Sequence, residues 1–171
     1  MRKSEAPRLL TLLLSLILIA SNFGALCAAV CLIQNRKLFT TAPKDIQEAA
    51  KEHPERFPGQ HVLGWKLAIL CVAAAIGTFV YGGFDGIKNG FTFWQFFVRF
   101  LVMLYLWKAF DIVCLDWLLL TKSHFFQHFY PETEDCAGYH SFGFNRKGQI
   151  IRILIFPFAA AALAGICLLI G

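Results

Sequence analysis

Four long apolar stretches constrain this chain more than any other feature of its sequence. They are residues 9–33, 62–81, 91–120 and 149–170. A helix needs roughly 20 residues to cross the hydrocarbon core of a bilayer, and each stretch reaches that length. We therefore expect an all-α, polytopic membrane protein in which four transmembrane helices form a bundle. The first stretch is too long for the apolar region of a cleaved signal peptide, so we expect it to remain as a helix.

The composition agrees with a lipid environment. Of the 171 residues, 57% are hydrophobic and 16% are charged, and the mean hydropathy of +0.58 is too high for a soluble fold of this size. Because the spans use about half of the chain, we expect a single transmembrane domain over residues 1–171 and no large soluble catalytic domain. The net charge of +5 fits loops beside anionic lipid, so the predicted partner is the lipid bilayer and no nucleic acid.

Two long polar loops, residues 34–61 and 121–148, separate the spans. Within the first loop, residues 44–53 are good helix formers that lie between Pro43 and Pro54. This segment has only a thin apolar edge, made by Ile46, Ala49 and Ala50. It predicts a short surface helix, which lies on the membrane or on the rest of the protein; a solvated helix is the alternative.

Glycine and proline predict where the helices turn or bend. Residues 81–86 contain three glycines, and Asn89 and Gly90 follow closely, so we expect a tight turn between the second and third spans. In the fourth span, Pro157 lacks an N–H and is predicted to kink the helix.

Small residues spaced four apart indicate how the spans could pack. Such pairs occur on the first, second and fourth spans, as Gly24 and Ala28, Ala73 and Gly77, and Ala161 and Gly165. In lipid, close backbone approach at small residues is a main source of helix association. The pairs favour a four-helix bundle, and they would equally suit packing against a membrane partner or a second copy.

The distribution of basic residues predicts the topology. Four crossings put both termini on one side of the membrane, together with the turn near Asp85. The basic residues on that side are Arg2, Lys3, Arg8 and Lys88. Those on the side of the long loops are Arg36, Lys37, Lys44, Lys51, Arg56, Lys66, Lys122, Arg146, Lys147 and Arg152. The excess favours long loops in the cytoplasm and both termini on the opposite side.

The third span carries charges that a membrane helix rarely has. Lys108 and Asp111 are three residues apart and can pair on one helix face, while Asp116 lies nearer to the long loops. Charges at this depth tend to face a bundle interior or a watery cavity, so they predict a polar pocket for a headgroup, an ion or a proton. A neutralised structural pair, with Asp116 at the interface, is the alternative. Arg99 is interpreted as a snorkelling side chain, with Gln95 as a possible partner.

A histidine pair follows the third span. If the helix continues past Leu120, the rings of His124 and His128 share a face and could bind a divalent metal, with Glu132 at the next position. Further ligands would come from the loop, namely Glu134, Asp135, Cys136 or His140. The alternative is that residues 124–130 form an aromatic belt at headgroup depth.

Function is less constrained than placement. The chain has no GxxxxGK[ST] or HExxH motif, and only Cys136 of six cysteines lies in a loop, which indicates packing rather than disulfides. We expect a small multi-pass integral membrane protein, accessory or structural, that packs against itself or a membrane partner. The alternative is a membrane-embedded enzyme or ligand-binding protein with a polar site at the cytoplasmic interface. Its candidate catalytic residues are Asp111, Asp116, His124 and His128, and its candidate metal ligands are His124, His128 and Glu132.

Overall fold

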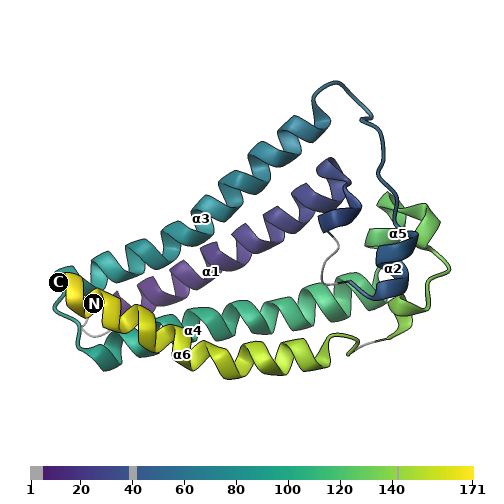
Figure 1. Cartoon of the computed structure of the whole chain (residues 1–171). Helices are drawn as coiled ribbons and strands as arrows, with labels where there is room; N and C mark the ends of the chain where they lie inside the picture. The colour runs from purple at the N-terminus through teal and green to yellow at the C-terminus, as the bar shows by residue number, and fades with distance from the viewer. Residues whose placement is uncertain (1–5, 39–41, 142) are drawn as a thin grey trace.

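The computed structural model describes residues 6–38, 42–141 and 143–171, and every element in them is helical (Figure 1). Four long helical segments dominate. They are α1 (Ala6–Cys27) continued by η1 (Ala28–Ile33), α3 (Gln60–Lys88), α4 (Phe93–Phe110) continued by η3 (Asp111–Lys122), and α6 (Arg146–Ile170). The all-helical expectation is confirmed for this part of the chain.

The short helices lie at one end of the molecule. They are η2 (Arg36–Leu38), α2 (Lys44–Ala49), α5 (Phe125–Phe129), η4 (Pro131–Thr133) and η5 (Ala137–His140). We call α2, α5, η4 and η5 together the loop cap. Figure 1 shows the start of α1, the C-terminus and the α3–α4 turn at the opposite end, which we call the terminal end.

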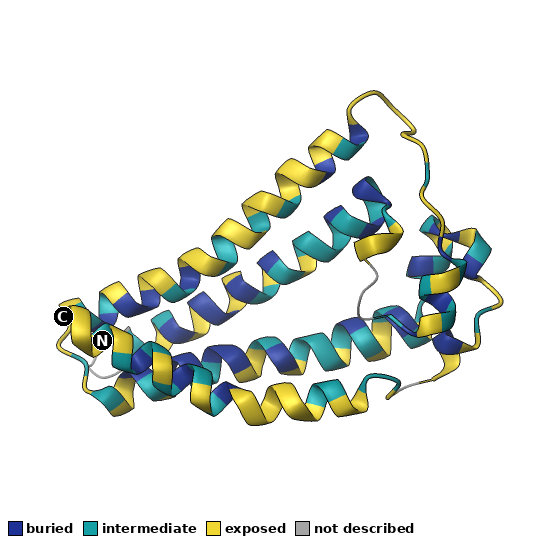
Figure 2. Cartoon of the chain, viewed as in Figure 1, coloured by how far each residue is buried: buried dark blue, intermediate teal, exposed yellow. Residues whose placement is uncertain are grey.

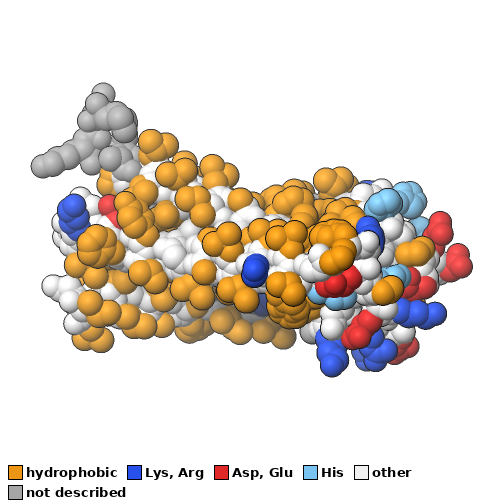
Figure 3. All heavy atoms as spheres, turned by 90° about the horizontal axis from the view of Figure 1, so that it is seen from above, with side chains coloured by type: hydrophobic (Ala, Val, Ile, Leu, Met, Phe, Trp, Pro, Cys, Tyr) orange, Lys and Arg blue, Asp and Glu red, His pale blue; other side chains and the backbone are white. Residues whose placement is uncertain are grey.

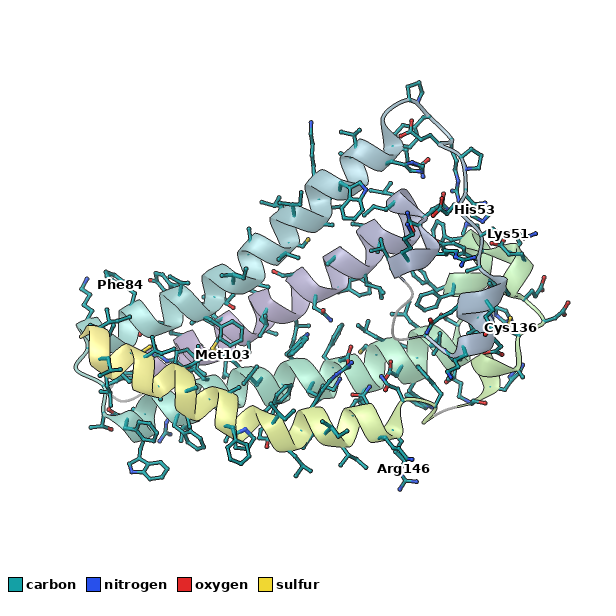
Figure 4. All side chains as sticks on the ribbon, viewed as in Figure 1. Lys51, His53, Phe84, Met103, Cys136 and Arg146 are labelled. Carbon is teal, nitrogen blue, oxygen red and sulfur yellow. The ribbon has the colours of Figure 1, made fainter. Side chains whose placement is uncertain are left out.

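The long helices pack through α1 and α4. Helix α1 contacts α3 and α4, and α4 also contacts α6. Their shared core contains Leu14, Leu18, Phe96, Phe100, Met103, Leu104, Phe156, Ala160 and Ala164. Figure 4 shows Met103 between the helices, whereas Phe84 lies on the outside of α3. The outer faces of α3 and α6 are largely exposed (Figure 2), which is where lipid would lie.

Three helices are long and apolar enough to cross a membrane: Pro7–Ile33, Gln60–Lys88 and Arg146–Ile170. Figure 3 shows hydrophobic side chains over the long helices, while most charged and histidine side chains gather at the loop cap. These features indicate an integral membrane protein. The predicted third span is also helical, over residues 93–122, but it has five charged residues, Arg99, Lys108, Asp111, Asp116 and Lys122, which set it apart from the other three.

The predicted turn at residues 81–86 is wrong, because α3 continues through it to Lys88. The turn itself is confined to Asn89 and Gly90, with Gly90 at a φ of 65°. The glycines inside α3 permit close packing instead of chain reversal. A Cβ atom on Gly86 would lie 2.2 Å from the ring of Phe96, and one on Gly83 would lie 2.9 Å from Cys167 Sγ.

The predicted surface helix is shorter than residues 44–53. Helix α2 ends at Ala49, because Ala50 is extended and the N–H of Lys51 donates to Glu132 instead of continuing the helix, at 2.8 Å. Its apolar edge packs on the rest of the protein, since Ile46 and Ala50 are buried in a second core with Tyr130. Figure 4 shows Lys51 in the extended segment that follows.

The small-residue pairs differ in whether they lie at a contact between helices. In α1, a Cβ atom on Gly24 would lie 2.9 Å from Cys71 Sγ, so this glycine stands at a close helix contact. Gly77 in α3 and Gly165 in α6 have nothing within 4 Å of a built Cβ atom. The last two pairs therefore do not hold the described helices together.

Two glutamines end η1. Gln34 has a left-handed φ of 49°, which stops the helix. The Nε2 group of Gln60, at the start of α3, donates to Leu32 O at 2.9 Å and to Gln34 Oε1 at 3.2 Å. Both glutamines are buried, and this bonding satisfies carbonyl groups that a helix end leaves without partners.

Candidate functional site

A cavity of about 280 Å³ lies between α1–η1 and η3, next to the loop cap. Its polar lining consists of Asn22 from α1 and of Asp111 and Asp116 from η3. Phe126 and Phe144 line it from the loop cap side. Asp111 and Asp116 are two of the charged residues for which the sequence predicts a polar pocket, and Asn22 is a lining residue that sequence reasoning missed.

The π-helical geometry of η3 builds the acidic face of the cavity. Asp111, Leu115, Asp116 and Leu120 all line it. In an α-helix, residues five apart point about 140° away from each other. In a π-helix, bonds from residue i to residue i+5 stack such residues one turn apart. Asp111 and Asp116 therefore face the same space, which a 3.6-residue period does not predict.

Each carboxylate has its own partner. Lys108 Nζ donates to Asp111 Oδ2, and the Lys108 side chain is only 3% exposed. Gln149 Nε2, at the start of α6, donates to Asp116 Oδ2. The predicted Lys108–Asp111 pair is present, while Asp116 has a neutral partner and no ion pair among the residues described.

The histidine pair lies outside this cavity. The helix continues past Leu120 only as far as Lys122, where η3 ends. Ser123 is extended, and α5 begins at Phe125. The side chain of Ser123 accepts the N–H of Phe125 at 3.3 Å. His124 and His128 are both exposed, and neither lines the cavity.

Glu132 is committed to a different contact. Its Oε1 atom lies 3.1 Å from His53 Nε2 and accepts the N–H of Lys51 at 2.8 Å. The structure therefore does not bring Glu132 to His124 and His128. Across residues 6–38, 42–141 and 143–171, no group of three His, Cys, Asp or Glu residues could hold a metal ion.

The aromatic residues 124–130 are not all at a lipid interface. Phe126 and Tyr130 are buried in the second core, which joins α2, η1, α5 and η5. Thr133 Oγ1 and Tyr139 Oη lie 2.7 Å apart in this core. Gly138 donates its N–H to Asp45 Oδ2 at 2.7 Å, so η5 is tied to α2. The loop cap is thus a packed unit, and its residue Phe126 also lines the cavity.

Carboxylates outside the spans are stabilised in their charged form. Partial burial of Glu132 opposes its charge, but hydrogen bonds from Lys51 and His53 outweigh this, so the pKa of Glu132 is lowered. Hydrogen bonds from the N–H groups of His61 and Gly59 lower the pKa of Glu55. Burial raises the pKa of Tyr139 in the loop cap.

The interpretation of Arg99 as a snorkelling side chain is wrong. Arg99 is 2% exposed, and its Nη1 group donates to Gly82 O at 2.7 Å and to Asp85 Oδ2 at 2.8 Å. Its guanidinium lies 4.3 Å from the centre of the Phe91 ring. Gln95 instead forms a capping box with Thr92 at the start of α4. The sequence signal for this ion pair was the presence of opposite charges, Asp85 and Arg99, on either side of a turn.

Comparison with family models, with curated proteins and with solved structures finds no match to this chain.

Proposed function

We propose that this chain is a four-span integral membrane protein that binds a small cationic group in the cavity beside η3. The observation that carries this proposal is the placement of Asp111 and Asp116 on one face of the cavity. Two carboxylates meet only one buried cation, Lys108, so the site favours one further positive charge. An ionised carboxylate at membrane depth is costly without such a partner.

The size of the cavity limits the ligand. Its volume of about 280 Å³ is just below the range of small-molecule sites, roughly 300–1,000 Å³. A monovalent metal ion with its water, or the ammonium group of a lipid headgroup, suits that space and charge. A divalent metal is the other cationic ligand to consider, and it would use Asp111 and Asp116 rather than the histidines.

The proposed topology puts the cavity near the cytoplasmic face. The α4–η3 segment serves as the fourth crossing, with residues 1–171 as one transmembrane domain in the cell membrane. Both long loops lie at the loop cap end, where most basic residues of the described chain are found. Arg2 and Lys3 of the opposite side lie outside the described residues.

The test is cation binding by protein in lipid nanodiscs. Calorimetric titrations would use sodium, potassium, magnesium, zinc, choline and ethanolamine with the wild type and with Asp116→Asn. We expect at least one of these cations to bind the wild type, and Asp116→Asn to weaken that binding at least tenfold. Asp135→Asn, which removes an exposed loop carboxylate, is the matched control and should bind as the wild type does.

Two results would contradict the proposal. One is equal affinity in the wild type and Asp116→Asn, and the other is no binding of any of the six cations. For the divalent case, tag-free wild type, Asp116→Asn and His128→Ala would be compared by elemental analysis. Loss of metal in His128→Ala alone would instead support the histidine site.

A second candidate function is that of an accessory or structural membrane protein that packs against itself or a partner. The observation that favours it is the open space around Gly77 and Gly165 on the exposed apolar faces of α3 and α6. Small residues on a lipid-facing surface allow another helix to approach closely. Gly77→Leu should then reduce the fraction of dimer measured by cross-linking in membranes, whereas Val80→Leu, which exchanges one exposed apolar residue for another, should not.

A further inference from the structure

We propose that a second cleft, at the terminal end, binds the phosphate headgroup of an anionic phospholipid. The cleft has a volume of about 960 Å³ and lies between the start of α1, the α3–α4 turn and the first half of α4. It is at the opposite end from the carboxylate cavity and shares no lining residue with it. The two sites are therefore independent.

Arg99 provides the buried cation of this site. It lines the cleft and is 98% buried, given its exposed fraction of 2%. Its Nη1 group is used by Gly82 and Asp85, but its Nε and Nη2 atoms are buried and have no hydrogen-bond partner in the described chain. Buried donors on a charged group are rarely left without acceptors. The planar fork of a guanidinium matches the oxygens of a phosphate group.

The other polar residues of the cleft favour an anion. Arg8 lines the cleft from α1, and it is exposed and so available to a ligand. No carboxylate of the described residues lines the cleft, and Asp85 is already paired with Arg99. The cleft also meets the N-terminus of the 18-residue α4, where the helix dipole favours negative charge.

The arrangement of polar and apolar residues indicates a lipid rather than free phosphate. Asn89 lines the cleft from the α3–α4 turn and Gln95 from the first turn of α4, while Val98 and Val102 line it further along α4. Seven helical residues separate Gln95 from Val102, a rise of about 10 Å. Leu12 of α1 also lines the cleft. Free phosphate would make no favourable contact with an apolar wall of this length. The glycerol and upper acyl chains of a phospholipid would pack against it.

The test uses native mass spectrometry to measure lipid bound to the detergent-solubilised full chain. Phosphatidylglycerol is titrated against the wild type, Arg8→Gln and Val98→Trp. Arg8→Gln removes a charge at the exposed mouth, and Val98→Trp fills the apolar part at a side chain that is 54% exposed. Neither variant removes a member of the Arg99–Asp85 pair. Lys88→Gln is the matched control, because Lys88 is an exposed cation at the same end that does not line the cleft.

We expect Arg8→Gln to weaken phosphatidylglycerol binding about fivefold, as one interfacial basic residue does, and Val98→Trp to weaken it at least as much. Lys88→Gln should bind like the wild type. Unchanged affinity in Arg8→Gln and Val98→Trp would overturn the proposal. In a second arm, sodium phosphate competes with the lipid. Displacement of the lipid by phosphate at an equal concentration would assign the cleft to free phosphate and would also overturn it.

Discussion

Single residues decide how closely α3 and α4 approach each other at the terminal end. Gly86 faces the ring of Phe96, which is 1% exposed and stacks 6.3 Å from the ring of Phe100. Gly77, about two and a half turns earlier on the same helix, faces open space. Both glycines are helical, but Gly86 is packed against a ring and Gly77 is not. Substitution of Gly77 is therefore a suitable control for substitution of Gly86.

We predict that Gly86→Ala destabilises the protein by up to about 2 kcal/mol. The added methyl group would overlap Phe96, and overpacking costs roughly 1–3 kcal/mol, of which better helix propensity returns about 1 kcal/mol. Gly77→Ala should be neutral or slightly stabilising in detergent-solubilised monomer, because only the propensity gain applies. Thermal unfolding followed by circular dichroism measures both. A loss of stability of the same size in the two variants would show that packing at Phe96 is not the cause.

The Arg99–Asp85 pair should be sensitive to loss of its acidic partner. We predict that Asp85→Asn costs on the order of 3 kcal/mol, because it leaves a buried guanidinium without its counter-charge. The readout is the midpoint of unfolding in a mixed-detergent titration. Asp135→Asn removes the same charge from an exposed loop site and should change stability by less than about 0.5 kcal/mol. An Asp85→Asn protein as stable as this control would contradict the pairing.

At the scale of elements, hydropathy predicted where the long helices lie but not how they pack. An apolar stretch of sufficient length determines a membrane helix locally, so the four long helices were predictable. The continuation of α3 through residues 81–86 depends on Phe96 and Cys167, which come from other helices. The π-helical form of η3 has no local signature either, so the shared face of Asp111 and Asp116 could not be predicted. The Lys108–Asp111 pair could, because its spacing suits either kind of helix.

The loop cap should loosen in acid through Glu132. The folded pKa of Glu132 is below its unfolded value of about 4.3, so its contribution to stability is complete above that pH. The contribution is lost as the pH falls through the folded pKa. We predict that hydrogen exchange of Lys51 and its neighbours accelerates over this range. In Glu132→Gln the exchange should already be fast at pH 6 and should change less with acid. If hydrogen exchange depends on pH in the same way in the wild type and in Glu132→Gln, then Glu132 does not stabilise the loop cap.

At the scale of the whole molecule, the apolar helices divide the chain into two polar ends. The loop cap is rich in charge and histidine, while the terminal end holds the α3–α4 turn and the Arg99 cleft. Their separation along the long helices suits two ligands of opposite charge on opposite faces of a membrane.

This arrangement predicts the result of cysteine labelling in intact cells. A membrane-impermeant maleimide should react with Lys88→Cys from outside the cell, because the topology that we propose puts the α3–α4 turn on that side. Glu134→Cys, in the loop cap, should react only after the membrane is opened. Both positions are exposed, so access by solvent is equal in the two variants. The reverse pattern would invert the proposed topology.

The π-helical segment ties the make-up of the cavity wall to the winding of a single helix. Each turn of η3 contains more residues than a turn of α-helix, so the same residues wound as an α-helix would form a longer segment. In that α-helix Asp116 would lie about 140° around the axis from Asp111, and the two carboxylates would no longer share one wall of the cavity. The number of negative charges on that wall would then depend on the twist of one segment.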